Sequence, residues 1–455
     1  MGHLVTDSVR LPINPYLSHD AGVASYNTAL GVPTPFEFDG VRTEERSWKT
    51  TAYLHAGLNP ADPFRLSGPD ALRLLEESCV NDFSVFRVGG AKHAVMCAES
   101  GNVIADGVIM RIGEEEFNCF FLNPVLRYLV ESGGYDVTLE DLSHELFLFQ
   151  VGGPRSLEIL ERATATDLHS LRFLRHTPTS IDTSEGPVEV RAFRFGVAGT
   201  LAYEVHGPLA SAPAVYDALV AAGQDLGLVR LGLRAYGMNH TQNGYVQAFI
   251  HFLPAWTDDP DLMAFLDGDA DQFLTQLPGS AGPDASKRFG TPFDFGWGDL
   301  VTFNHDFTGR AALEQAVQGR RPVTLAWNRD DVVAVVASQF DDHPADHLDL
   351  YAEPIWTASN SVVVGDDVLR GDDVVGISSG RIFSPSERQM LSLAILDSTH
   401  ATLGTQLEVL WGAPGTPQRR IRATVAPFPH LALTRNPDVS TAPIPRPTPR
   451  RSSDA

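Results

Sequence analysis

The chain has 455 residues, of which 43% are hydrophobic, and its formal net charge is -23 at pH 7. Single hydrophobic cores rarely grow beyond about 250 to 300 residues, so this length predicts more than one compact unit. The negative charge would repel phosphate backbones and anionic lipid surfaces, which argues against generic binding of nucleic acids or membranes.

The cysteines and the N-terminus indicate the compartment. The 3 cysteines form no CxxC pair, and so sparse a set in a chain of this length fits a reducing compartment better than a disulfide framework. The N-terminus lacks the apolar core of a signal peptide, and no apolar run reaches the roughly 18 residues of a membrane span. We therefore expect a cytoplasmic protein.

The first part of the chain changes character at residue 45. Residues 1–44 are rich in Pro, Gly, Asn and Ser, which predicts an extended arm lying on the body of the protein. An apolar face at 68–79 predicts a helix. Three apolar runs, at 92–100, 101–112 and 114–122, are separated by Gly or acidic turns and predict antiparallel strands.

The next segments alternate between strands and helices. We expect strands at 145–151, 188–195 and 201–208, and helices at 152–164 and 212–227. The long parallel crossovers of a doubly wound sheet are missing from this pattern. The predicted fold class is therefore α+β.

A second unit follows near the C-terminus. Residues 319–432 show short apolar runs with turns, which predicts a small β-barrel or sandwich. Residues 433–455 have the Pro and Ser content of a disordered tail. The main α+β region is thus expected at 45–318.

Two short motifs fail on their spacing. The sequence HELFL at His144 lacks a second histidine four residues after the first, so it cannot form a zinc-binding helix. GISSG at 376–380 is followed by Pro385 before any helix could begin, unlike the nucleophile elbow of hydrolases. The sequence has no P-loop and no GxGxxG after a strand, and it implies neither a metal nor a nucleotide cofactor.

Residues 233–245, LRAYGMNHTQNGY, combine aromatic, amide and imidazole side chains. After Arg234 the segment has no charged side chain apart from His240, if that histidine is protonated. An ordinary amphipathic helix would place charged residues between apolar ones. This concentration of uncharged hydrogen-bonding groups makes the segment a candidate site.

The segment FRFGVAGTLAYEVHGP carries a family resemblance. Its Gly196, Gly199 and Glu204 have the spacing of the folate-site signature of the glycine-cleavage T-protein, roughly G-Y-T-G-E-D-G-F-E. Four further stretches agree with that family in chain order: LSGPDALRLLEESCVND, SGNVIADGVIMRI, QVGGPRSLEIL and VGISSGRIFSPSERQMLSLAILD. The resemblance covers roughly residues 45 to 430. It implies a folate-binding α+β region with a central funnel and a C-terminal β-barrel domain packed against it.

Within that family the chain most resembles the tetrahydrofolate-dependent aryl O-demethylases of the vanillate/3-O-methylgallate type. The resemblance lies in RSWKTTAYL, GGAKHAVMCAESGNVIADG and GWGDLVTFNHDFTGRAAL. It implies tetrahydrofolate as cofactor and transfer of a methyl group from a methoxylated aromatic acid to N5. Another one-carbon transfer, of an aminomethyl or hydroxymethyl group, and a non-catalytic folate-binding protein remain alternatives. Whether the protein forms a homodimer is left open.

Aryl ether cleavage calls for a general acid, because phenolate is a poor leaving group unless it is protonated as the bond breaks. Tyrosine suits this task, since its pKa of about 10 is close to that of the released phenol. Where aminomethyltransferases read roughly A-R-D-T-L-R-L-E-A-G, this chain has Tyr236 for Arg and Gln242 for Glu. The demethylases also carry a tyrosine there, so the resemblance makes Tyr236 the expected proton donor. A packed aromatic with its hydroxyl satisfied is the alternative.

The resemblance also implies cofactor contacts. Glu204 is expected to accept hydrogen bonds from the 2-amino and N3 groups of the pterin. Tyr245 stands where the demethylases have tryptophan, suited to stacking on the pterin or its aryl tail. Gln150 and Arg111 match further folate or substrate contacts of the family. Asp106 belongs to a paired-Asp signature whose first position is alanine here, so we do not expect a plain glycine-cleavage component.

Three residues are expected at the substrate. Tyr26 and His55 are in register with substrate-pocket residues of the demethylases. His251, together with Phe249, replaces small or kinked positions and would reshape the cavity. The expected partner is a small methoxyarene that need not be vanillate.

Overall fold

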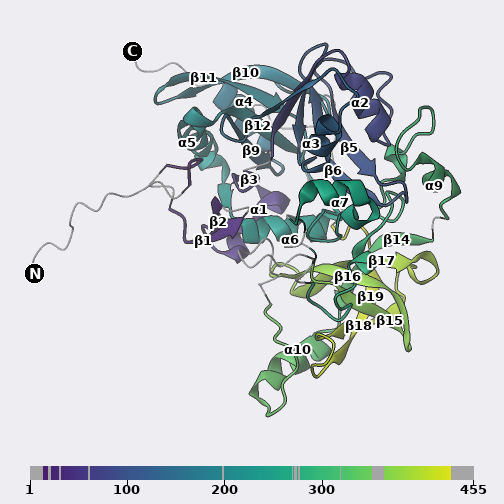
Figure 1. Cartoon of the computed structure of the whole chain (residues 1–455). Coiled ribbons are helices and arrows are strands. Elements are labelled where there is room, and N and C mark those ends of the chain that lie inside the picture. The colour runs from purple at the N-terminus through teal and green to yellow at the C-terminus, as the bar shows by residue number, and fades with distance from the viewer. Residues whose placement is uncertain are drawn as a thin grey trace, which may run out of the picture.

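The computed structural model describes residues 14–18, 22–29, 32–59, 62–196, 199–268, 270, 274, 277–317, 319–350 and 363–431. It has an α+β region, purple to teal in Figure 1, and a barrel domain, green to yellow, packed against it. The predicted tail at 433–455 lies outside the described residues. Among the helices that are described, none has both the length and the apolar character needed to cross a bilayer.

A six-stranded sheet forms one half of the α+β region, in the order β10-β11-β12-β9-β3-β13. Its strands are β3 (Ala52–His55), β9 (Leu146–Gly152), β10 (His176–Thr183), β11 (Gly186–Phe193), β12 (Ala202–Pro208) and β13 (Leu228–Leu231). Helices α4 (Ser156–Thr164) and α5 (Ala212–Gly223) cover one face, packing on apolar side chains such as Phe149, Val151 and Val205. The other face points toward the middle of the molecule.

An antiparallel five-stranded sheet forms the other half, in the order β5-β6-β7-β4-β8. Its strands are β4 (Phe64–Ser67), β5 (Ala91–Cys97), β6 (Val103–Arg111), β7 (Glu116–Phe120) and β8 (Thr138–Asp141). Its core also contains apolar residues of α2 (Ala71–Ser78), α3 (Val125–Glu131) and α7 (Pro260–Leu266). The antiparallel strands predicted between residues 92 and 122 are β5, β6 and β7.

Helices α1 (Val41–Thr50) and α6 (Leu233–Asn243) lie between the sheets and the barrel. The predicted arm is ordered in part as a hairpin of β1 (Ser25–Ala29) and β2 (Val32–Glu37), and β2 packs on α6. Helix α1 begins before the expected boundary at residue 45. Gly40 turns the chain with a φ of 91°, and Glu37 Oε1 accepts the N–H of Val41 at 2.8 Å.

The C-terminal domain is a closed barrel in the order β14-β17-β16-β15-β18-β19, which confirms the predicted barrel. Its strands are β14 (Arg320–Trp327), β15 (Asp366–Arg370), β16 (Asp373–Ser384), β17 (Gln389–Asp397), β18 (Gln406–Trp411) and β19 (Arg419–Ala426). Helix α9 (Arg310–Gln315) precedes β14, and α10 (Arg329–Ala337) follows it. The barrel contacts α6 through β16 and β17.

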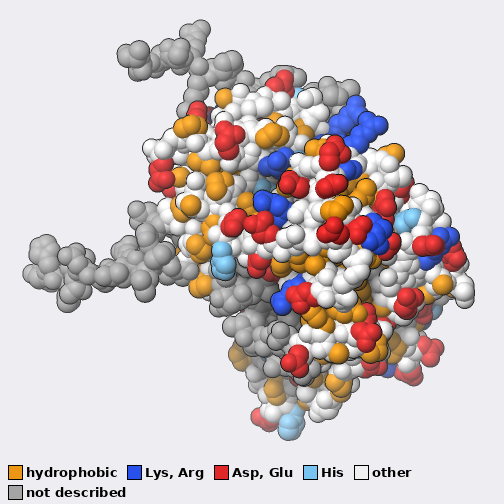
Figure 2. Space-filling view, turned by 45° about the horizontal axis from the view of Figure 1, so that its top comes forward, with side chains coloured by type: hydrophobic (Ala, Val, Ile, Leu, Met, Phe, Trp, Pro, Cys, Tyr) orange, Lys and Arg blue, Asp and Glu red, His pale blue; other side chains and the backbone are white. Residues whose placement is uncertain are grey.

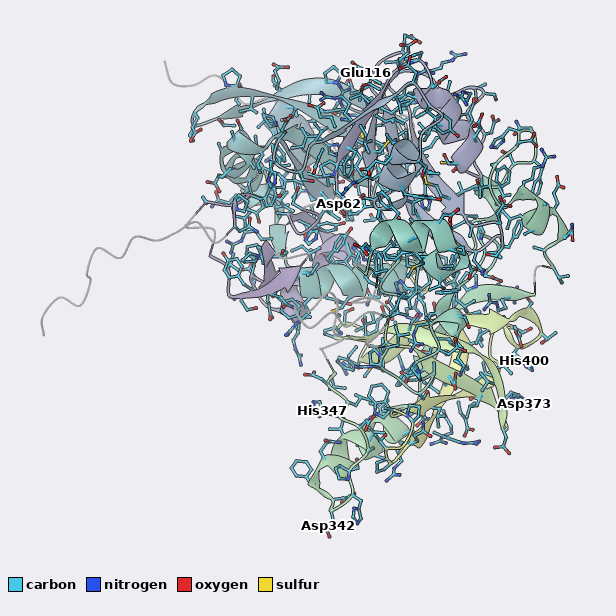
Figure 3. All side chains as sticks on the ribbon, viewed as in Figure 1. Asp62, Glu116, Asp342, His347, Asp373 and His400 are labelled. Carbon is cyan, nitrogen blue, oxygen red and sulfur yellow. The ribbon has the colours of Figure 1, made fainter. Side chains whose placement is uncertain are left out.

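Charged side chains cover the outside of the molecule. Figure 2 shows acidic side chains spread over the visible face with basic ones between them, in keeping with the net charge of -23. Figure 3 places Glu116 at the upper end of the molecule, Asp342 at the lower end, and Asp373 at the edge of the barrel. The layer between the two sheets differs from this surface, because its polar groups are buried.

Candidate active site

Strand register places a row of polar side chains on the inner face of the six-stranded sheet. Glu204 on β12 pairs with Gln150 on β9, and Gln150 pairs with His55 on β3. Cross-strand partners point to the same face, so the three side chains are neighbours. Tyr53, two residues before His55, shares this face and donates its hydroxyl to Gln150 Oε1. All four side chains are buried, with exposed fractions of 0 to 6%.

Helix α6 brings Tyr236 onto this row. Its ring stacks on His55, with ring centroids 4.0 Å apart and planes 13° from parallel. His240, one turn further along the helix, contacts the same ring edge-on at 4.5 Å. Burial, then the nearby Tyr53, Glu204 and Tyr245, raise the pKa of Tyr236 well above its ordinary value. The phenol therefore keeps its proton at neutral pH and can act as a donor.

Both imidazoles beside Tyr236 are neutral. His55 Nδ1 lies 2.8 Å from the carbonyl of Leu231, and His240 Nδ1 lies 2.8 Å from the carbonyl of Tyr236. A carbonyl only accepts, so each Nδ1 carries the hydrogen and each Nε2 is an acceptor. His55 Nε2 has no hydrogen-bond partner in the described part of the chain. Burial lowers the pKa of His55 to about 3 and that of His240 to about 4. Both imidazoles are thus uncharged at pH 7, and His55 Nε2 is available as a hydrogen-bond acceptor.

These two histidines predict a loss of stability in acid. In the unfolded chain they take up protons below about pH 6.5, whereas in the folded chain they stay neutral until about pH 4 and below. Their contribution is therefore complete above pH 6.5 and is lost as the pH falls. Each should lower the free energy of unfolding by about 1.4 kcal/mol per pH unit between pH 6 and 5. Urea titrations of wild type and His240→Gln at several pH values measure this slope. An unchanged slope in the variant would contradict the assignment.

The five-stranded sheet contributes the opposite wall of the cluster. His93 Nε2 on β5 lies 3.2 Å from Asp106 Oδ2 on β6. The ring of Tyr245 lies 6.3 Å from His93 and 5.5 Å from His240, measured between centroids. The contacts run from Asp106 through His93 and Tyr245 to His240 and Tyr236, so residues far apart in the sequence form one cluster.

The cluster contains polar groups that suit a pterin. Glu204 Oε2 accepts a hydrogen bond from His206 Nε2 at 3.1 Å. Buried atoms Gln150 Nε2, His55 Nε2 and His206 Nδ1 have no hydrogen-bond partner in the described part of the chain. Buried polar atoms are normally paired, so unmatched donors and acceptors here favour a polar ligand. A pterin ring, with donors and acceptors along its edge, fits this donor and acceptor set.

The loop before β12 approaches α6 closely. Gly199 has a φ of 66°, and a Cβ atom added to it would lie 2.4 Å from Asn243 Oδ1. Only glycine can combine this backbone conformation with so close an approach. Gly199 of the sequence signature therefore allows the loop to lie against Asn243 at the end of α6.

Arg111 and Tyr26 are not part of this cluster. The guanidinium of Arg111, at the end of β6, donates to the carbonyls of Phe86, Gly113 and Glu114. Tyr26 lies on β1 with 42% of its side chain exposed. Arg111 therefore holds loop carbonyls in place, and Tyr26 lies on the surface of the hairpin.

His251 is buried at the joint between α6 and the barrel. Its Nδ1 accepts the N–H of Gln247 at 3.1 Å, and its Nε2 lies 3.3 Å from Thr241 Oγ1. Thr241 donates in turn to the carbonyl of Gly380 on β16 at 2.6 Å. Both ring nitrogens are thus engaged within the protein.

Several residues of the cluster were given no role by the sequence. Tyr53 and His206 each lie two residues from a predicted site residue on the same strand, and His240, within the candidate segment 233–245, lies four residues from Tyr236 on the same helix. The periods of strand and helix could have indicated them. His93 could not have been found in this way, because it comes from the other sheet.

Comparisons with known proteins agree with this architecture. The family model described as the GCVT N-terminal domain matches residues 17–248. The sesamin methylene transferase of Sinomonas sp. (strain No.22) is 42% identical over 432 residues, covering 91% of this chain and 94% of the relative. The syringate O-demethylase of Sphingobium sp. (strain NBRC 103272 / SYK-6) is 32% identical over 434 residues, covering 90% and 92%.

A solved structure gives the same fold. The glycine cleavage system aminomethyltransferase T from Bartonella henselae superimposes with a TM-score of 0.64 at 16% identity, covering 91% of this chain and 96% of that one. The chain belongs to the glycine-cleavage T-protein (GCVT) family, which confirms the predicted family and the predicted α+β fold with a C-terminal barrel.

Proposed function

We propose that this chain is a tetrahydrofolate-dependent O-demethylase that moves the methyl group of a methoxylated aromatic compound to N5 of tetrahydrofolate. The observation that carries the proposal is the phenol of Tyr236, held between two neutral imidazoles in the same buried cluster as Glu204. Support also comes from the similarity to an enzyme named for O-demethylation of syringate and to one named for methylene transfer with sesamin.

The chain's own residues supply binding and proton transfer. Glu204 and Gln150 would hold the pterin edge, and the ring of Tyr245 would pack beside it. Tetrahydrofolate, when bound, supplies the nitrogen that accepts the one-carbon group. Tyr236 donates its proton to the aryl oxygen as the bond from oxygen to the methyl carbon breaks. Tyr236 would regain a proton from the one that N5 would release on methylation, so the reaction would need no oxidant or reductant.

Other cluster members have supporting roles. His55 Nε2, an acceptor, would hold a hydroxyl group of the substrate, and His93 would orient Asp106. We leave Arg111 and Tyr26 out of the proposed contacts because of their placement. His251 would shape the substrate cavity indirectly, by fixing α6 against the barrel.

Methylene transfer from a methylenedioxy ring is the second candidate. The observation that favours it is the higher identity, 42%, to the sesamin methylene transferase. The same machinery would serve, because that reaction also releases phenolic oxygens that need protons. Its folate product would be the 5,10-methylene form in place of the 5-methyl form.

We further propose that the enzyme acts in the cytoplasm, in the breakdown of small aromatic molecules. The cysteines Cys79, Cys97 and Cys119 are free and buried, as suits a reducing compartment. The demethylation and methylene-transfer activities named for its relatives support a small aromatic substrate.

The test is to incubate the purified protein with tetrahydrofolate and a panel of methoxylated acids and methylenedioxy arenes. We expect 5-methyltetrahydrofolate and the matching phenol, both detected by mass spectrometry. A 5,10-methylene product would support the second candidate. Folate that binds but gains no carbon from any compound would contradict the demethylase and favour the other two alternatives, a different one-carbon transfer or a non-catalytic folate-binding protein.

A further inference from the structure

The chain returns to α6 after it leaves the barrel. Strand β19 ends at Ala426, and residues 428–431, which we call the C-terminal strap, lie against the C-terminal end of the helix. The N–H of Leu431 donates to the carbonyl of Gln242 at 3.1 Å. This carbonyl is in the last turn of α6, where a helix has no N–H of its own to offer. The strap thus caps the helix that carries Tyr236.

The two apolar side chains of the strap pack on different cores. Leu431 packs on the core that contains Tyr236. Phe428 packs on the core that contains Val246, just past the end of α6. Between these cores the chain turns at Gly244, where an added Cβ atom would lie 2.9 Å from Phe428 Cε2. The strap therefore contacts the chain before, at and after this turn.

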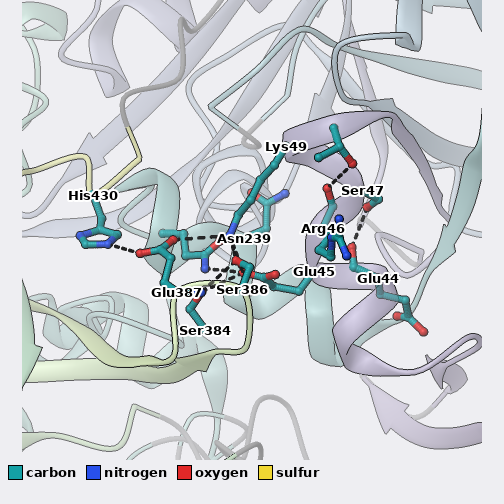
Figure 4. A network of polar contacts seen from close by, with 12 residues as sticks. Glu44, Glu45, Arg46, Ser47, Lys49, Asn239, Ser384, Ser386, Glu387 and His430 are labelled. Atoms are coloured by element: carbon teal, nitrogen blue, oxygen red, sulfur yellow. Dashed lines mark hydrogen bonds and ion pairs between the residues drawn. The ribbon is translucent and has the colours of Figure 1, made fainter. Parts of the chain in front are cut away.

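A line of charged side chains joins the strap to α1. His430 Nε2 donates to Glu387 Oε2 in the turn after β16, and Lys49 Nζ lies 3.5 Å from Glu387 Oε1. Lys49 also pairs with Glu45, whose Oε1 accepts a hydrogen bond from Gln242 Nε2 at 2.8 Å. Figure 4 shows this line running from His430 to Glu45. It ends on Gln242, the residue whose carbonyl the strap caps.

These ion pairs are partly shielded from water. The side chains of His430, Glu387 and Lys49 are 17, 27 and 16% exposed, and that of Glu45 is fully buried. Burial alone would raise the pKa of Glu387, but the hydrogen bond and charge of His430 and the charge of Lys49 hold it below its ordinary value. Partly buried pairs are screened less by salt than exposed ones. The line can therefore keep the strap in one position.

The two ends of α6 are held by different elements. At its start, Glu44 Oε2 of α1 accepts the N–H of Gly232 at 2.8 Å, and its end is held by the strap. Tyr236 lies between these points, and its ring stacks on His55 of β3. A shift of the helix end would therefore move the phenol relative to the sheet that carries Glu204.

We propose that the C-terminal strap positions Tyr236 for proton transfer, with His430 and Leu431 as its positioning residues. This inference rests on the proposed function, in which Tyr236 protonates the departing aryl oxygen. His430 and Leu431 act through α6 and not by contact with the reacting atoms. A displacement of about 1 Å at the reacting groups can cost about 100-fold in rate, so a small movement of the helix end is enough.

The main test is His430→Ala/Leu431→Ala, which removes the ion pair and the apolar contact of the strap. We expect kcat to be about 10- to 100-fold lower at saturating folate and substrate, with folate affinity within about threefold of the wild type. The loss should be larger for substrates that release more basic phenols, because these depend most on the proton donor. A loss of stability alone would not vary with the phenol released.

The same double substitution in the Tyr236→Phe background shows whether the strap acts through the phenol. If it does, kcat should stay within about threefold of that of Tyr236→Phe alone. Losses that multiply would overturn the proposal, as would an unchanged kcat when the strap is substituted in the wild type.

Two further variants separate positioning from general effects. His430→Gln/Leu431→Met keeps a hydrogen-bond donor and an apolar side chain of similar volume, so it should retain most of the rate. Leu403→Ala/Arg422→Ala is the matched control, because it removes an exposed leucine of the barrel and an ion pair between β19 and α10. Its kcat should equal that of the wild type. Equal losses in the control and in the strap variant would overturn the proposal.

A failure of the proposed function is distinguishable from a failure of the strap. If the wild type turns over no substrate, hydrogen exchange still reports on the N–H groups of Gly244 and Tyr245, which donate to carbonyls of α6. Faster exchange there in the strap variant than in the control would support the hold of the strap on the helix alone, and unchanged exchange would overturn it. Turnover that the strap variant leaves unchanged would support the demethylase alone.

Discussion

Replacing Tyr236 by phenylalanine is expected to lower kcat by about 100- to 10,000-fold, the usual contribution of a positioned general acid. The variant keeps the ring that stacks on His55 and loses only the hydroxyl. The departing aryl oxygen would then leave as an unprotonated phenolate. Folate affinity should change by less than about threefold, because the groups proposed to hold the pterin lie on β9 and β12. Single-turnover kinetics and calorimetric folate binding measure the two effects separately.

Tyr203→Phe is the matched control. Tyr203 precedes Glu204 on β12 but points to the opposite face, into the core formed with α4 and α5. Its hydroxyl is buried and has no hydrogen-bond partner among the residues that the structure describes. Loss of this hydroxyl should leave kcat nearly unchanged. Retention of most of the rate in Tyr236→Phe, or an equal loss in both variants, would remove Tyr236 from the mechanism.

The helices and strands that the sequence predicted are those formed by a local pattern of apolar residues. Strands β5, β6 and β7 follow from apolar runs divided by turns, and α4 and α5 follow from apolar residues at helical spacing. Strand β10 (His176–Thr183) was not predicted. Its sequence HTPTSIDT is mostly polar, and only His176 and Ile181 are buried. Pairing with β11 along its full length makes this segment a strand, and such pairing is a tertiary effect.

The roles of individual site residues were predictable only where a family motif marks them, although the composition of 233–245 already indicated a site on that segment. Glu204 and Tyr236 were found by the resemblance, and the structure brings them into one buried cluster. The neutral state of His55 was not predictable, because it depends on the carbonyl of Leu231, which lies 176 positions away in the sequence. Arg111 matched the family by sequence position, yet its guanidinium is engaged by nearby loop carbonyls. Sequence position therefore indicates the strand that carries a residue better than it indicates the partners of its side chain.

The exchange of Glu for Gln at residue 242, relative to the aminomethyltransferase pattern, has a structural reason. Glu45 of α1 is fully buried, and its Oε1 accepts hydrogen bonds from Gln242 Nε2 at 2.8 Å and from Ser384 Oγ at 2.9 Å. Lys49 forms an ion pair with the same carboxylate. Figure 4 shows Glu45 and Lys49 of α1 beside Ser384, the last residue of β16, and Ser386 in the turn that follows. A second carboxylate at 242 would meet Glu45 at hydrogen-bond distance.

Gln242→Glu is therefore expected to lower the free energy of unfolding by about 3 kcal/mol at pH 7.5, because a buried carboxylate would lose a donor and gain a like charge. Protonation of one of the two carboxyl groups would relieve the repulsion, so the loss should shrink as the pH is lowered toward 5. The double variant Glu45→Gln/Gln242→Glu restores one amide and one carboxylate, and it should regain most of the stability.

A double-mutant cycle in urea measures this interaction, with Glu45→Gln as the fourth member. The cycle should give a coupling free energy of about 1 to 3 kcal/mol between positions 45 and 242. Additive losses, with a double variant less stable than either single one, would show that the two side chains do not interact. Because Gln242 lies on the helix that carries Tyr236, the restored double variant should also recover turnover. Stability without turnover would mean that the amide at 242 is needed for the position of α6 as well as for its stability.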